Sequence, residues 1–187
     1  MMRRKVRQYQ IVLDHQKIVE KALMVDADLN EGEKQIKTAF KYLIDGQDKK
    51  VIEHLQMAID IYPSDPDVHK ILYILQMQYL KDAEAAELSI ARAIKECPDY
   101  EPAYNHLGYA LMDQGRFDEA EKAFNTYIEL SPNTANPYDS KGDFYMATCQ
   151  YKSAYTSYMR AYEIDPSFSV SKKKAQKAEV LLNRSAL

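Results

Sequence analysis

The sequence predicts an all-α protein built from stacked helical hairpins, and three observations indicate this fold class. Only 5 glycines and 7 prolines occur among 187 residues, fewer than sheets and phosphate-binding loops usually need at their turns. Apolar residues recur at the three- to four-residue spacing of amphipathic helices. Most of the chain also repeats with a period of about 34 residues, which is typical of helical units that share one continuous core.

The composition is that of a globular protein, because 46% of the residues are hydrophobic and 28% are charged. A formal net charge of -3 provides no overall attraction to nucleic acid or to an anionic membrane. Two cysteines, Cys97 and Cys149, are too few to form a disulfide framework in a chain of this length. The composition therefore favours a protein with a core of its own and excludes a disulfide-stapled one.

Residues 1–31 are expected to form an N-terminal helix and a linker. At helical spacing, residues 5–25 place apolar side chains on one face, which either closes the first repeat or pairs with a second copy. This face comprises Tyr9, Val12, Val19 and Leu23. The apolar run at residues 11–13 is too short for a signal peptide or a membrane-spanning helix. We therefore expect a cytoplasmic protein, although an exported protein whose leader had been trimmed would have the same sequence.

Four repeats are expected at residues 32–66, 67–100, 101–134 and 135–168. The last two align without a gap, through the pairs Tyr104 and Tyr138, Gly108 and Gly142, Phe117 and Tyr151, Ala120 and Ala154, Phe124 and Tyr158, and Pro132 and Pro166. The second repeat keeps Ala86, Ile90, Ala93 and Pro98 in the same register. The first is weaker and has one extra residue, Pro66. A pattern held over four units predicts a repeat architecture.

Each repeat is expected to contain two antiparallel helices, such as residues 103–114 and 118–130. Gly115 in the turn between them can adopt a positive φ. Small residues allow the two helices to approach closely, which suits Gly108 against Ala120. The large rings of Tyr104, Phe117 and Phe124 are expected to fill the space around this contact. A proline such as Pro132 ends the second helix, because it cannot continue the hydrogen-bond ladder.

Residues 169–187 are expected to form a C-terminal capping helix. This segment has five basic residues and one acidic residue, whereas residues 32–168 have 14 basic and 22 acidic residues. Helical spacing places Val170, Ala178 and Leu181 or Leu182 near one face of this helix, with the basic residues distributed elsewhere. The polar side chains of the segment would then supply the soluble outer surface that a terminal repeat needs.

The third and fourth repeats, residues 101–168, resemble a known family. The spacing of Tyr104, Leu107, Gly108, Ala120, Phe124 and Pro132 is similar to the signature of the tetratricopeptide repeat, with tyrosine in place of the usual tryptophan. The resemblance implies a right-handed superhelix of helical hairpins whose first helices line a concave groove. It also implies that the groove binds a peptide or a segment of another protein.

The resemblance assigns fifteen residues to this groove. They are Ile71, Leu75, Gln78, Tyr79, Asn105, His106, Tyr109, Met112, Asp113, Asp139, Ser140, Asp143, Lys173, Lys174 and Lys177. An apolar ligand side chain would lie near Leu75, Tyr79 and Tyr109, and basic ligand groups would meet the three aspartates. An acidic terminus would meet the lysines of the cap. The basic set with which some family members clamp chaperone C-termini is absent from the corresponding positions.

No pattern indicates catalysis, a metal site or a cofactor. Asp26, Asp28 and Asn30 resemble the start of a calcium loop, but Glu31 and Lys37 occupy positions where that motif needs glycine and glutamate. The four histidines have no metal-ligand spacing, and the glycines are too dispersed for a phosphate loop. No Gly-x-Ser-x-Gly sequence occurs. Many tyrosines recur at packing positions and the basic residues gather at the two ends, so nucleic-acid binding is not expected.

The sequence therefore predicts a non-enzymatic scaffold that binds a protein or peptide. One alternative is a self-associating module, in which the N-terminal helix or an exposed repeat edge forms a homodimer. A second alternative is the repeat domain of an exported bacterial protein, because residues 136–140 resemble many such repeats.

Overall fold

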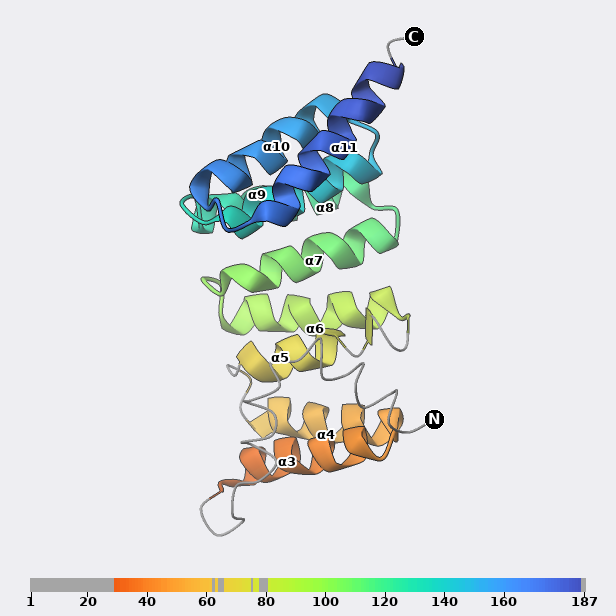
Figure 1. Cartoon of the computed structure of the whole chain (residues 1–187). Helices are drawn as coiled ribbons and strands as arrows, with labels where there is room; N and C mark the ends of the chain where they lie inside the picture. The colour runs from red at the N-terminus through yellow and green to blue at the C-terminus, as the bar shows by residue number, and fades with distance from the viewer. Residues whose placement is uncertain (1–28, 62, 64–65, 75, 78–80, 186–187) are drawn as a thin grey trace. The chain divides into compact units, whose positions relative to one another are not determined.

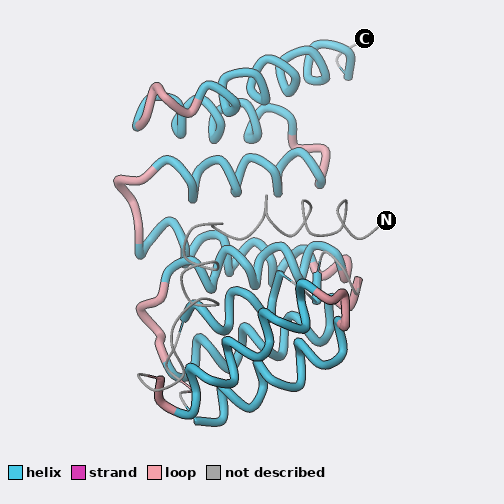
Figure 2. Tube along the Cα trace, turned by 60° about the horizontal axis from the view of Figure 1, so that its bottom comes forward, coloured by secondary structure: helices cyan, strands magenta, loops and turns pink. Residues whose placement is uncertain are grey.

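The computed structural model describes residues 29–185 except residues 62, 64, 65, 75 and 78–80 (Figure 1). The chain forms two compact units, Met1–Pro98 and Asp99–Leu187, called here unit 1 and unit 2. Every regular element in the described part of the chain is a helix, as Figure 2 shows. The all-α fold class is thereby confirmed. The predicted N-terminal helix and its apolar face lie outside the described residues.

Unit 1 contains two helical hairpins within its described residues. Helix α3 (Glu31–Ile44) packs against α4 (Asp48–Ile61), and α5 (Pro66–Ile74) packs against α6 (Ala83–Glu96). Asn30 begins α3 with a capping box: its Oδ1 accepts the N–H of Glu33 at 3.0 Å, and a carboxylate oxygen of Glu33 accepts the N–H of Asn30 at 3.0 Å. Thus Asn30, which resembled part of a calcium loop, starts a helix instead.

Unit 2 contains two further hairpins and a terminal helix (Figure 1). Helix α7 (Glu101–Asp113) packs against α8 (Phe117–Leu130), and α9 (Ala135–Ala147) packs against α10 (Tyr151–Ile164). Helix α8 also contacts α9, and α11 (Ser169–Ser185) packs against α10. Each helix thus covers the apolar face of its neighbours, as stacked repeats require.

The turn within each hairpin contains one residue with a positive φ. Its positive φ falls on Gly46 at 71°, Lys81 at 57°, Gly115 at 74° and Cys149 at 59°. These positions are 35, 34 and 34 residues apart, and the longer interval contains the additional Pro66. Glycine adopts this left-handed conformation readily, whereas residues with a Cβ are disfavoured in it.

Replacing Cys149 with glycine is expected to stabilise unit 2 by about 1 kcal/mol, because it removes the penalty of a side chain at positive φ. The opposite change, Gly115→Ala, is the matched control: a Cβ there meets no atom within 4 Å, so only the backbone penalty acts. It should destabilise by a similar amount. Urea denaturation measures both, and a stability loss in Cys149→Gly would contradict the explanation.

The glycines of α7 and α9 lie directly against aromatic rings of the second helices. A Cβ on Gly108 would lie 2.6 Å from Cζ of Phe124, and one on Gly142 would lie 2.5 Å from two ring carbons of Tyr158. Both rings are buried. The ring of Phe124, one helical turn after the predicted partner Ala120, is thus the nearest group to Gly108. Phe117, expected in the core, has 41% of its surface exposed.

Helix α11 is rotated relative to the prediction. Ser171, Ala175 and Ala178 are its buried residues, whereas Val170 is 60% exposed. Ala178 was predicted correctly and Val170 was not. The physical reason is that small side chains allow α11 to approach α10, where Ala175 and Ala178 form one cluster with Ala154 and Tyr158.

Candidate functional site

The candidate site is one side of unit 2, formed by the first helices of its repeats and by the terminal helix. We call it the α7–α9–α11 face. It is defined by Asn105, Tyr109 and Met112 of α7, Asp139, Asp143 and Met146 of α9, and Lys173, Lys177 and Val180 of α11. Within each helix these residues are spaced three or four apart, so they share a side. The same positions recur from helix to helix after 34 residues.

Asp143 is the centre of a hydrogen-bond network that joins four helices. Its carboxylate accepts the hydroxyl of Tyr109 on α7 at 3.0 Å and the hydroxyl of Tyr158 on α10 at 2.7 Å. Nζ of Lys174 on α11 lies 2.9 Å from Oδ1 and 3.0 Å from Oδ2 of the same carboxylate. Hydrogen bonds to a charged acceptor are stronger than neutral ones, so this centre ties the helices together.

Asp139 belongs to the same network. Its Oδ1 accepts the hydroxyl of Ser171 at 2.5 Å, and its Oδ2 lies 2.7 Å from Nζ of Lys174. Lys174 therefore bridges two carboxylates one helical turn apart. The sequence predicted that these groups would face a ligand separately. The structure brings them together, and the charges of Asp139, Asp143 and Lys174 largely satisfy one another.

The network perturbs the ionisation of its members. Burial raises the pKa of Tyr109, and the nearby charge of Asp143 raises it further. Burial also raises the pKa of Tyr158, together with its hydrogen bond to Asp143. For Lys174, burial lowers the pKa, but the hydrogen bonds to Asp139 and Asp143 outweigh this effect and the net shift is upward. All three groups therefore hold their protons more tightly in the folded state.

Unit 2 is consequently expected to lose stability in alkali. A group whose folded pKa is raised contributes stability that is complete below its unfolded pKa, here near 10, and is lost as the pH rises further. The urea midpoint should therefore fall between about pH 10 and 12. Tyr158→Phe should flatten this dependence, whereas the control Tyr155→Phe on the same helix should not. Equal slopes in both variants would contradict the assignment.

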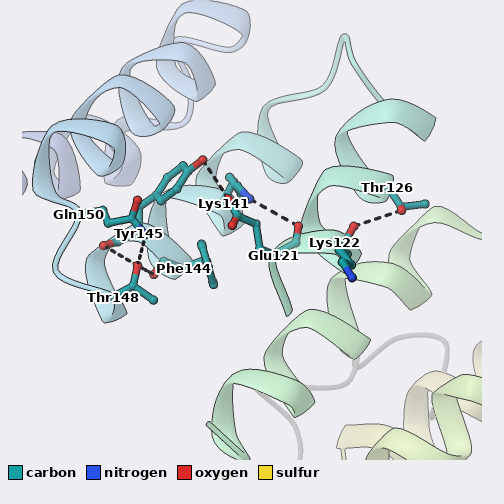
Figure 3. A network of polar contacts seen from close by, with 8 residues as sticks. All are labelled: Glu121, Lys122, Thr126, Lys141, Phe144, Tyr145, Thr148 and Gln150. Atoms are coloured by element: carbon teal, nitrogen blue, oxygen red, sulfur yellow. Dashed lines mark hydrogen bonds and ion pairs between the residues drawn. The ribbon is translucent and has the colours of Figure 1, made fainter. Parts of the chain in front are cut away.

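A second network lies between α8 and α9 (Figure 3). Lys141 is only 3% exposed, and its Nζ lies 2.9 Å from Oε1 of Glu121. The same ammonium lies 4.8 Å from the ring centroid of Phe144 and 4.9 Å from that of Tyr145. Burial lowers the pKa of Lys141, and the hydrogen bond to Glu121 partly restores it. Sequence reasoning missed this pair, although Lys141 occupies the position that Leu107 has one repeat earlier, and a charge at that position was the available signal.

The remaining predicted groove residues differ in their surroundings. Ile71 is buried within unit 1. The other three predicted residues of that unit lie outside the described residues: Leu75, Gln78 and Tyr79. In unit 2, Ser140 is buried, while Asn105, His106 and Met112 are half-buried. Asp113, Lys173 and Lys177 are exposed. The groups of unit 2 that are open to a ligand are therefore fewer than the prediction assumed.

The described part of the chain contains no cluster of three or more histidine, cysteine, aspartate or glutamate side chains that could hold a metal ion. None of the helices in that part combines the length and the apolar character that crossing a membrane requires.

Two solved structures resemble the fold of the chain over most of its length. The crystal structure of TTC0263, a thermophilic TPR protein in Thermus thermophilus, has a TM-score of 0.72 and 16% identity, and the match covers 96% of this chain and 97% of that one. A MamA structure from MSR-1 has a TM-score of 0.59 and 23% identity, covering 87% and 97%. At these identities the likeness concerns the fold alone.

A third such structure is MamA from Desulfovibrio magneticus RS-1, with a TM-score of 0.62 and 16% identity over 83% of this chain and 93% of that one. No curated protein matches the chain in sequence. Two tetratricopeptide repeat models, however, match residues 102–134 and 135–168. The helical hairpins, the recurring turn and these two matches agree, and we conclude that residues 102–168 are tetratricopeptide repeats.

Proposed function

We propose that this protein is a non-enzymatic scaffold that binds a peptide or protein segment along the α7–α9–α11 face. The observation that carries the proposal is the network around Asp143, which holds α7, α9 and α11 in one arrangement through their side chains. A surface that is ordered before binding loses little conformational entropy when a ligand arrives. The matches of residues 102–168 to tetratricopeptide repeats support the same role, because such repeats typically mediate protein interactions.

Groups suited to a peptide remain on this face after the network is formed. Met112 and Met146 are half-buried and offer flexible apolar surface. Oδ1 of Asn105 is buried and has no hydrogen-bond partner among the described residues, so a peptide N–H would complete it once the side chain turned toward the ligand. Exposed Asp113 lies at the end of the same helix. The face thus combines apolar contact with backbone recognition, as peptide-binding surfaces do.

The proposal is tested by selecting ligands from a random peptide library with the full chain and mapping each by NMR amide shifts. We expect shifts on α7, α9 and α11. The variant Asn105→Ala with Asp113→Ala should weaken binding by about tenfold, corresponding to about 1.4 kcal/mol. The matched control, Asn125→Ala with Asp118→Ala, removes the same side-chain types from exposed positions of α8 and should change affinity less than about twofold. Shifts confined to α8 and α10 would refute the proposed site.

A further inference from the structure

The charges of the α7–α9–α11 face are distributed unequally between paired and open groups. Asp139 and Asp143, the carboxylates that could have attracted a basic ligand, are bonded to Lys174, Ser171 and tyrosine hydroxyls. A cationic group of a ligand would have to compete there with Lys174, whose ammonium already pairs with both carboxylates. Asp139, Asp143 and Lys174 together leave a net charge of -1 in the middle of the face, and both carboxylates are already engaged.

The α11 end of the face carries open basic groups. Lys173 and Lys177 are both exposed, are four residues apart and make no ion pair among the described residues. Val170, 60% exposed, and Val180, 49% exposed, lie on the same side of the helix. We call these four residues the α11 stripe. Each lies one 34-residue period after a residue of α9, namely Asn136, Asp139, Asp143 or Met146. The stripe therefore continues the face onto the terminal helix.

The neighbouring lysines of α11 are engaged differently. Lys174 is bonded to the two aspartates, and Nζ of Lys172 lies 4.9 Å from the ring centroid of Tyr162. The rotation of the helix thus divides its lysines into a structural pair and an outward pair. One helical turn of rise, about 6 Å, separates Lys173 from Lys177, and about 15 Å separates the two valines that flank them.

We propose that the α11 stripe binds an acidic amphipathic segment of a partner protein, an inference that rests on the proposed function of the face. Two carboxylates four residues apart on a helical ligand match the spacing of Lys173 and Lys177. Apolar ligand side chains one turn outside the carboxylates meet Val170 and Val180. Charge selects the partner, and the two valines contribute apolar contact.

Other polyanions fit this surface less well. Single-stranded nucleic acid binds where aromatic rings stack on its bases, and the α11 stripe contains no aromatic residue. A long phosphate backbone or an anionic bilayer would also extend beyond α11, toward residues 99–168, which carry 11 acidic and 5 basic residues. A short acidic segment avoids that repulsion because its charge ends with the stripe.

The test uses three fluorescent helical peptides of equal length with leucines flanking two ionisable positions four residues apart. These positions hold glutamate, glutamine or lysine. Fluorescence anisotropy with the full chain should show binding of the glutamate peptide at least about tenfold tighter than of the glutamine peptide, and little binding of the lysine peptide. Raising the salt concentration should weaken the glutamate complex selectively.

The variant Lys173→Glu with Lys177→Glu should bind the glutamate peptide at least about tenfold more weakly. The matched control, Lys122→Glu with Lys152→Glu, makes the same charge change at exposed positions of α8 and α10 and should change affinity less than about threefold. Val170→Ser with Val180→Ser should weaken binding about threefold or more. Thermal melting checks that every variant remains folded. We expect this because all the substituted residues are exposed.

The outcomes separate this inference from the proposed function. Equal losses in the two lysine variants, or equal affinity for the glutamate and glutamine peptides, would overturn the acidic-partner assignment while shifts on α7 and α9 still supported the face. Shifts on no part of the face with any peptide would overturn both. Tighter binding of single-stranded RNA or anionic vesicles, or salt-sensitive dimerisation through Lys173 and Lys177 in place of peptide binding, would also refute the assignment.

Discussion

Replacing Phe124 with alanine is expected to lower the free energy of unfolding of unit 2 by about 3–5 kcal/mol. Phe124 is fully buried, and its ring lies against Gly108 and at 5.3 Å and 5.9 Å, between centroids, from Tyr109 and Phe144. Glycine has no side chain that could move into the cavity, so collapse around the missing ring is limited. Urea denaturation measures the loss.

The matched control is Phe117→Ala, which removes the same ring from the exposed start of α8. It should cost less than about 1 kcal/mol, because most of the effect of a Phe→Ala change comes from burial and cavity formation. Similar losses at the two positions would show that Phe124 is not the packing centre of the α7–α8 hairpin.

A double-mutant cycle tests the contact between Gly108 and the ring of Phe124. In the wild type, Gly108→Ala forces a Cβ to within 2.6 Å of the ring of Phe124 and is expected to cost about 1–3 kcal/mol. In the Phe124→Ala background the clash is gone, and the higher helix propensity of alanine should make the same change neutral or stabilising by up to about 1 kcal/mol. The same cost in both backgrounds would contradict the geometry.

Replacing Asp143 with alanine is expected to cost about 2–4 kcal/mol, the second largest effect. The substitution removes the shared acceptor of Tyr109, Tyr158 and Lys174. It leaves the hydroxyls of both tyrosines without this carboxylate, and a buried group that loses its partner costs its full desolvation. Partial exposure of Asp143 and Lys174, at 30% and 31% of their side chains, keeps the cost below that of a fully buried ion pair.

The control for Asp143 is Asp113→Ala, an exposed aspartate at the end of α7, which should change stability by less than about 0.5 kcal/mol. A second variant, Lys174→Met, should cost clearly less in the Asp143→Ala background than in the wild type, because the two residues share one interaction. Additive effects would refute the network.

The fold class was predictable because its causes are local and periodic. Gly115 marks a turn through its backbone freedom, Pro132 follows the end of a helix, and the same features return 34 residues later. The chain therefore indicates its helices and their order without knowledge of any long-range contact. The same reasoning located Tyr109, Asp143 and Lys174 on helices that the structure joins through hydrogen bonds.

The partners of side chains were harder to predict, because they depend on how far each helix is rotated about its axis. Val170 and Ser171 are adjacent in sequence, yet one is exposed and the other buried. The position along the axis matters too, because the side chain nearest to Gly108 is that of Phe124, one helical turn beyond Ala120. Lys141 carries a charge, yet packing between Glu121 and two aromatic rings buries it.

The amino-acid order alone thus specified helices, turns and repeat length, since propensity, capping and apolar spacing act within a few residues of each position. Packing of the helices against one another determined which charged side chains are paired and which stay exposed. Lys173, Lys174 and Lys177 cannot be told apart from the sequence. The orientation of α11 pairs Lys174 with Asp139 and Asp143 and leaves the other two lysines exposed. Electrostatic pairing depends on distances in space, and those distances exist only once the helices are packed.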